Sequence, residues 1–211
     1  MPEPRGEHVP CLPDGLLLES VVSTLNADGS PHLAPMGPIV DAGFSRLLLR
    51  PYQTSVTYQN LKRTRQGVMH VTDDVALFAR AAVGQLKELP ELVPATAIKG
   101  VVLKDTCRWY AFRVVSIDDR QERTEIVAET VDHGRVRDFF GFNRAKHAVI
   151  EAAILATRIK FIAASEVEAE FERLAVPIAK TGGHQEHRTF AFLQRYVHEQ
   201  IANLRTESIP Q

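Results

Sequence analysis

The chain has 211 residues, of which 45% are hydrophobic and 24% are charged. This is the composition of a folded globular protein and excludes an intrinsically disordered chain. Its length is somewhat more than that of one average domain. Lysine and arginine total 25 against 26 aspartate and glutamate residues, so the net charge of -1 offers no basic surface for nucleic acid.

Membrane-spanning and secreted proteins are also poor matches to this sequence. It has no run of about 18 apolar residues, the length that a membrane-spanning helix needs. Residues 1–7 are polar and lack the apolar centre of a signal peptide. Cys11 and Cys107 form no CxxC pair, which argues against both a disulfide framework and a structural zinc site. We therefore expect a cytoplasmic protein that spans no membrane.

The first half of the chain has the pattern of short strands separated by turns. Residues 16–25 are rich in β-branched and apolar side chains, and a hairpin turn signal follows at residues 26–29. A second strand is expected over residues 32–40, interrupted by a glycine and two prolines. Such a strand lies at a sheet edge or carries a bulge.

Strands and short helices then alternate. The expected elements are a strand at 47–50, a helix at 56–66 that Gly67 ends, a strand at 68–72, and a helix from the capping pair Asp73 and Asp74 to about Ala82. Three further strands are expected at 99–103, 109–117 and 124–131, with Asp118 and Asp119 in the last hairpin connection. About six or seven strands joined by hairpins fit a closed antiparallel barrel.

The C-terminal third has helical periodicity instead. Apolar residues recur at helical spacing from Asn143 to Lys160. A capping box at residues 165–168 opens a second helix, which Pro177 closes, and a glycine pair forms the next linker. The apolar face of the last helix comprises Phe190, Leu193, Val197, Ile201 and Leu204. The expected organisation is a flexible N-terminus at 1–14, a barrel at 15–139, a helical domain at 140–205 and a tail at 206–211.

One stretch has the residues of a phosphate cradle. Arg50 ends a strand, and Ser55 and Thr57 come at the start of the next helix. Unpaired N–H groups at a helix start, two hydroxyls and a guanidinium together suit a phosphate. In the alternative interpretation, Ser55 or Thr57 only caps the helix and Arg50 is solvated.

A second stretch, residues 31–38, combines small residues with prolines. Such a strand lets a flat ligand approach the backbone closely, although an irregular barrel edge would have the same composition. Asn143 and Arg144 stand at a helix start, where they can reach a ligand in the barrel or simply cap the helix. His184 and His187 lack the HExxH spacing and a third ligand, so we expect no metal site.

Taken in order, these segments resemble the FMN-binding split-barrel superfamily. The matching segments are 19–24, 28–29, 34–37, 50–52 and 55–61, and residues 142–154 resemble the start of an added C-terminal helical domain. Within the superfamily, the chain is similar to a family in which a flavin-reductase-like barrel carries that domain. The resemblance implies an antiparallel split β-barrel followed by a C-terminal three-helix region.

The resemblance also implies a function. Proteins of this kind are homodimers that hold FMN non-covalently at the subunit interface. Carried over by position, the isoalloxazine ring would be lined by Ala34, Pro35, Met36 and Gly37. The phosphate would be held by Arg50, Ser55 and Thr57, with Asn60 near the ribityl or phosphate end and His70 close to the flavin.

The expected activity is that of a flavin-reductase-like oxidoreductase with a nicotinamide or another electron donor, because the flavin itself transfers the electrons. The alternative is a module that binds FMN or another phosphorylated ligand without turnover. No residue of the sequence stands out as a catalytic acid or base.

Overall fold

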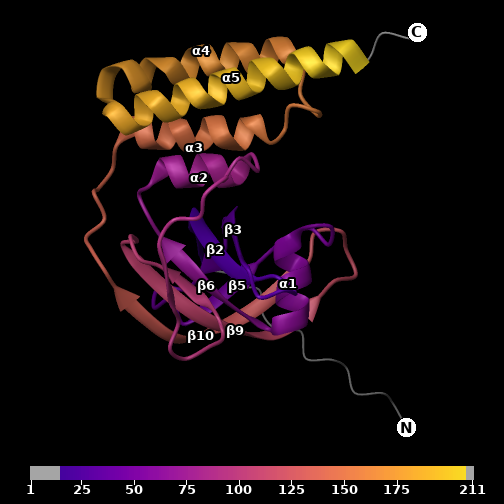
Figure 1. Cartoon of the computed structure of the whole chain (residues 1–211), viewed down its shortest axis with the longest axis vertical. Coiled ribbons are helices and arrows are strands. Elements are labelled where there is room, and N and C mark those ends of the chain that lie inside the picture. The colour runs from indigo at the N-terminus through magenta and orange to yellow at the C-terminus, as the bar shows by residue number, and fades with distance from the viewer. Residues whose placement is uncertain (1–14, 208–211) are drawn as a thin grey trace.

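A computed structural model describes residues 15–207 of the chain. The expected N-terminal segment 1–14, and residues 208–211 of the expected tail, lie outside the described residues. Figure 1 shows a curled sheet with α1 (Val56–Thr64) at one side and α2 (Val75–Ala82) above it. The helices α3 (Arg144–Ala156), α4 (Ala164–Thr181) and α5 (His184–Glu207) form a further layer above α2.

The main sheet is antiparallel and has eight strands in the order β1-β4-β5-β10-β9-β6-β2-β3. Its strands are β1 (Leu16–Leu17), β2 (Ser20–Leu25), β3 (Pro31–Met36), β4 (Ile39–Val40), β5 (Arg46–Leu49), β6 (Gln66–Val71), β9 (Arg108–Asp118) and β10 (Glu125–Arg135). Its hydrogen-bonded order ends at β1 and β3 and does not return on itself, so the barrel is split and not closed. The predicted fold class, a split barrel followed by a three-helix region, is confirmed.

Two strands that the sequence predicts as continuous are each broken. The stretch 16–25 forms β1 and β2, and the stretch 32–40 forms β3 and β4. The two breaks are neighbours in the sheet. Leu18 N, in the first break, donates a hydrogen bond to Pro38 O, in the second, at 3.0 Å. Gly37 passes so close to β1 that a Cβ atom there would lie 2.9 Å from Leu17 Cδ2. The strands β7 (Leu92–Pro94) and β8 (Val101–Leu103) form a second, two-stranded sheet that packs against β6 and β2, and β7 was not predicted.

The glycine expected to end α1 has another role. Helix α1 ends at Arg65, which takes the left-handed conformation (φ 58°) and donates its N–H to Leu61 O. Gly67 lies within β6, where an added Cβ would be 2.8 Å from Phe112 Cζ. Gly67 therefore permits the close packing of Phe112, and the prediction that it stops the helix was wrong.

The predicted ends of the C-terminal helices also need correction. Helix α3 stops at Ala156, four residues before the predicted Lys160. Helix α4 begins with Ala163 as its N-cap, so Ser165 lies inside the first turn and cannot cap it. Pro177 lies inside α4 and does not close it, because burial of Ile178 stabilises the continued helix. The capping of α2 by Asp74 and the buried face of α5 are confirmed.

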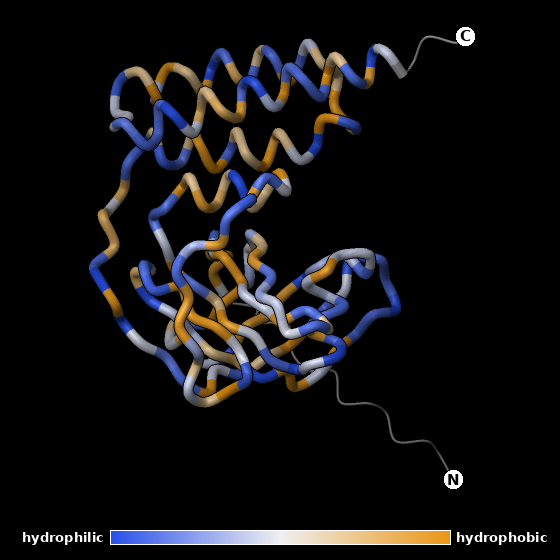
Figure 2. The backbone as a smooth tube through the Cα atoms, viewed as in Figure 1, coloured by the Kyte–Doolittle hydropathy of each residue, from blue (hydrophilic) through white to orange (hydrophobic). Residues whose placement is uncertain are grey.

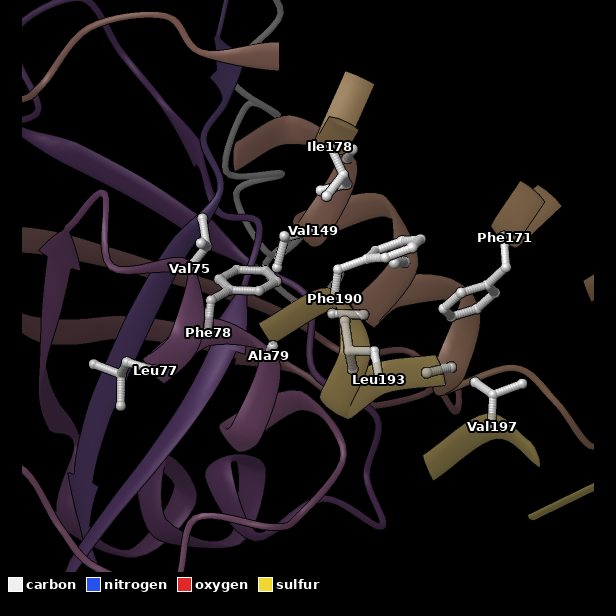
Figure 3. Close-up of a cluster of buried hydrophobic side chains, with 14 of the residues drawn as sticks. Val75, Leu77, Phe78, Ala79, Val149, Phe171, Ile178, Phe190, Leu193 and Val197 are labelled. Atoms are coloured by element: carbon white, nitrogen blue, oxygen red, sulfur yellow. The ribbon is translucent and has the colours of Figure 1, made fainter. Parts of the chain in front are cut away.

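One apolar core joins the sheet to the helices. It contains Val21 and Leu33 from the sheet, Phe78 from α2, Val149 from α3 and Leu193 from α5. Figure 3 shows side chains of α2, α3, α4 and α5 converging in this core, and Figure 2 shows hydrophobic and hydrophilic residues alternating along these helices. A second core fills the curl of the sheet around Phe112. No helix within residues 15–207 is both long enough and apolar enough to cross a membrane.

Because this core is shared, the sheet and the helices should unfold together. Leu193→Ala removes a fully buried side chain and should lower the free energy of unfolding by about 2–5 kcal/mol. Leu89→Ala, at a position with 47% exposure, is the control and should change it by less than about 0.5 kcal/mol. Urea unfolding followed by far-UV circular dichroism checks both values. Two separate transitions in the wild type would contradict a shared core.

Candidate functional site

A hollow of about 420 Å³ lies between the edge of the sheet and the helical layer. This volume is in the range of small-molecule sites. Strand β3, the start of α1, helix α2 and the end of α3 all contribute to its lining. Most of the predicted site residues meet there: Ala34, Pro35, Met36, Gly37, Arg50, Ser55 and Thr57.

The wall that β3 provides is an edge strand, as its prolines predict. It pairs only with β2, with Val21 opposite Pro35 and Val22 opposite Ala34. Ser20 Oγ donates to Met36 O at 2.8 Å and holds the end of the strand in place. Because no strand within residues 15–207 pairs with its other side, backbone groups of β3 are available to a ligand in the hollow.

At the start of α1, the hydroxyl of Ser55 is already engaged. Ser55 Oγ donates to Tyr52 O at 2.7 Å and accepts from Tyr58 N at 3.2 Å. Ser55 is therefore the N-cap of the helix, as the alternative interpretation has it. Within the described chain, the N–H groups of Val56 and Thr57 have no hydrogen-bond partner, and neither does the Thr57 hydroxyl. These donors and the positive end of the helix dipole make this an anion-binding position.

Three guanidinium groups line the same hollow, from Arg50, Arg123 and Arg158. Arg50 Nε is buried and has no hydrogen-bond partner among residues 15–207. Arg123 Nε donates to Arg50 O at 3.4 Å, and the Arg123 guanidinium lies 5.9 Å from the ring centre of Tyr52. In the described part of the chain, none of the three forms an ion pair with a carboxylate.

Sequence reasoning missed Arg123 and Arg158 because both come from distant segments. The isolated bridge between Tyr52 and Arg123 brings one of them to the hollow, and the chain turn after α3 brings the other. The carboxylate in the lining belongs to Glu19. Partial burial raises the pKa of Glu19, and the negative charge of Glu151 raises it further.

The structure does not bring Asn60 or Asn143 into this hollow. Asn60 is 4% exposed, and its Nδ2 donates to Thr24 Oγ1 and to Asn26 Oδ1, both at 3.0 Å. This amide ties α1 to the hairpin between β2 and β3. Asn143 caps α3 by accepting from Lys146 N, and its Nδ2 donates to Thr181 O.

His70 does not line the hollow either, and lies fully buried on β6, opposite Val21 of the neighbouring strand β2. Its Nδ1 is 3.0 Å from Val21 O, and its Nε2 accepts a hydrogen bond from Leu103 N at 3.1 Å. These partners require a neutral ring with the proton on Nδ1, which donates to Val21 O. Burial lowers the pKa of His70 to about 4. The imidazole therefore joins β2, β6 and β8.

Metal-ligating side chains do not cluster in the described chain. Within residues 15–207, no three side chains of His, Cys, Asp or Glu gather so that they could hold a metal ion. Near the two histidines at the start of α5, the carboxylate of Glu186 is 2.9 Å from Lys146 Nζ and accepts from Gly183 N at 2.9 Å. These contacts join α5 to α3.

Comparison with family models gives two matches along the chain. A model described as the N-terminal domain of a protein of unknown function (DUF447) matches residues 18–137. A second model, described as a protein of unknown function (DUF447), matches residues 143–195. No curated protein matches the sequence.

Two solved structures show the same fold. The FMN-bound protein MM1853 from Methanosarcina mazei, of the DUF447 family, is 23% identical, with a TM-score of 0.69 over 85% of this chain and 94% of its own. A flavin reductase domain protein from Arthrobacter sp. FB24 is 17% identical, with a TM-score of 0.50 over 57% of this chain and 79% of its own.

The buried histidine predicts a pH dependence of stability. The unfolded chain binds a proton at His70 below its ordinary pKa of about 6.5, whereas the folded chain keeps the ring neutral down to about pH 4. Stability is therefore complete above pH 6.5 and falls as the pH drops toward 4. The loss at pH 5 relative to pH 7.5 should be about 2 kcal/mol.

Urea unfolding at the two pH values measures this loss. His70→Gln should lower stability at both values but reduce the difference between them, because glutamine does not titrate. His198→Gln, at an exposed position on α5, is the control and should keep the wild-type difference. An equal pH dependence in His70→Gln and wild type would refute the assignment.

Proposed function

This chain belongs to the DUF447 family, and we propose that it is a flavoprotein that binds FMN non-covalently and acts as a flavin-reductase-like oxidoreductase. The observation that carries the proposal is the hollow itself, where unpaired cationic and N–H donors lie beside an edge strand. The FMN bound in MM1853 of the same family supports the choice of ligand.

The end of the hollow at α1 fits the phosphate of FMN. Arg50 has a buried Nε without a partner among the described residues, which a phosphate oxygen would satisfy. The free N–H groups of Val56 and Thr57 and the Thr57 hydroxyl would complete the set. Ser55 would act mainly by holding the helix start in place, because its hydroxyl already bonds to Tyr52 and Tyr58.

The edge strand β3 fits the isoalloxazine ring. Ala34 and Gly37 have little or no side chain to obstruct a flat ring, and the side of β3 away from β2 pairs with no other strand among residues 15–207. Phe78, Ala81 and Ile154 of the helical layer line it as well and exclude water from part of it. When bound, the flavin supplies hydride and electron transfer, and the protein supplies binding, orientation and electrostatics.

A second candidate function is a module that binds FMN or another phosphorylated ligand without turnover. The observation that favours it is the wall of α2 and α3, where a bound ring could be covered on the face that a nicotinamide would need. Anaerobic addition of NADH or NADPH to the FMN-loaded protein distinguishes the two. Bleaching of the flavin absorbance supports a reductase, and an unchanged spectrum with both donors favours the binding module.

The first test of the proposal is flavin retention with an Arg50 variant. The protein should retain FMN through desalting, and Arg50→Ala should weaken FMN binding by about 1.5–3 kcal/mol, or roughly 10- to 150-fold. Arg195→Ala, at an exposed position on α5 that does not line the hollow, is the control. A wild-type protein that retains no FMN would refute the proposal, and an unchanged affinity in Arg50→Ala would refute the phosphate assignment.

We further propose a homodimer with the FMN at the subunit interface. The support is an exposed aromatic segment between β10 and α3, in which Phe139, Phe140 and Phe142 are 49%, 73% and 96% exposed. A monomer seldom leaves so much aromatic surface in water, so this segment suits contact with a second subunit.

Size-exclusion chromatography with light scattering at micromolar concentration should give twice the chain mass of 23.5 kDa. The double variant Phe140→Ser and Phe142→Ser should shift the protein toward the monomer. A monomeric wild type would contradict the shared site.

A further inference from the structure

A second, smaller hollow of about 220 Å³ lies among α2, the turn after α3, and α5. The two adjoin, because Ala82 and Thr157 line both of them. Tyr196 and Leu204 from α5 give the second hollow an apolar and aromatic side, and Gln200 adds an amide. The proposed flavin site thus borders a second hollow that C-terminal helices help to form.

Two cations stand at this junction, on the turn that follows α3. Arg158 lines the first hollow and Lys160 lines the second. Ile159 between them is 7% exposed and belongs to the shared core, so its burial fixes the turn and leaves the flanking cations exposed. The turn is also closed by a hydrogen bond from Phe161 N to Arg158 O at 2.8 Å.

Neither cation has an acidic partner. In the part of the chain that the structure describes, Arg158 and Lys160 make no ion pair. The lining of the two hollows includes four cations, Arg50, Arg123, Arg158 and Lys160, and one carboxylate, Glu19. A phosphate monoester carries a charge of about -2 at most, so FMN would leave a surplus of positive charge at the helical end.

We infer that Arg158 and Lys160 bind the anionic group of the second substrate, the compound that exchanges electrons with the flavin. This inference rests on the proposed function and deepens it by naming the substrate class. The substrate is an organic anion with a phosphate or carboxylate group, whose uncharged part has room beside Tyr196 in the second hollow. Both charged groups suit recognition by a guanidinium and an ammonium.

The helical region is the right place for a residue that selects the substrate. The match to the flavin reductase domain protein covers 57% of this chain, a share that leaves much of it outside the common fold. Arg158 and Lys160 belong to the C-terminal region that the second family model matches, at residues 143–195. A barrel with the common fold can thus bind a different substrate when an added helical region lines part of its site.

The inference can be tested by isothermal titration calorimetry on the FMN-loaded protein at constant ionic strength. Sodium pyrophosphate probes phosphate recognition and sodium citrate probes carboxylate recognition. At least one should bind the wild type, and the double variant Arg158→Ala, Lys160→Ala should bind it at least tenfold more weakly. The single variant Arg158→Lys, which keeps the charge, should retain part of the affinity, and Arg195→Ala should match the wild type.

Three results would overturn the inference. Failure of both probes to bind the wild type, or equal binding by the double variant, would show that these cations hold no anion. A parallel loss of FMN affinity in the double variant would assign Arg158 to the flavin phosphate instead. Binding of one probe alone identifies the charged group and supports the inference.

The proposed function fails separately, at the loading step, if the wild type takes up no FMN. The same titrations on the flavin-free protein then decide the anion site. In the flavin-free protein, loss of pyrophosphate or citrate binding in the double variant but not in Arg50→Ala would support the anion site at Arg158 and Lys160. Equal loss in both variants would place the anion at α1 and overturn the inference.

Discussion

The packing of α2 between the sheet and α3 is the contact on which the rest of the structure depends. Phe78 of α2 lies in one core with Leu33 of β3 and Val149 of α3, so a single buried cluster joins the two halves of the chain. Asp73, next to the cap of this helix, accepts hydrogen bonds from Arg137 and from Phe140 N. Burial of this apolar surface supplies most of the stabilisation, and the polar contacts fix the orientation.

This packing also creates the hollow. Helix α2 packs between β3 and α3, and residues of all three elements line the hollow. The same arrangement brings Arg50 and Arg123 from the sheet side together with Arg158 from the helical side. Like charges that share a hollow repel one another, so the chain without ligand gains nothing from their proximity. The proposed anionic ligand would offset this repulsion.

Features that depend on neighbours in the sequence were predictable. Asp74 caps α2 through its own side chain, and the 3.6-residue period of α5 marks its buried face without reference to any other element. The edge position of β3 follows from Pro35, which cannot donate to a neighbouring strand. Gly67 and Pro177 were misjudged because the packing of Phe112 and Ile178 outweighs local preference there.

The sequence by itself determined the succession of a strand-rich part and a helical part, the irregular strand before Val40, and the cluster of Arg50, Ser55 and Thr57 at a helix start, since these depend on residues a few positions apart. Only the tertiary structure decided which predicted residues share a hollow and which, such as His70, are buried elsewhere. It alone brought Arg123 and Arg158 to that hollow. The physical reason is that burial and pairing between distant segments fix side-chain surroundings, and local spacing carries no record of them.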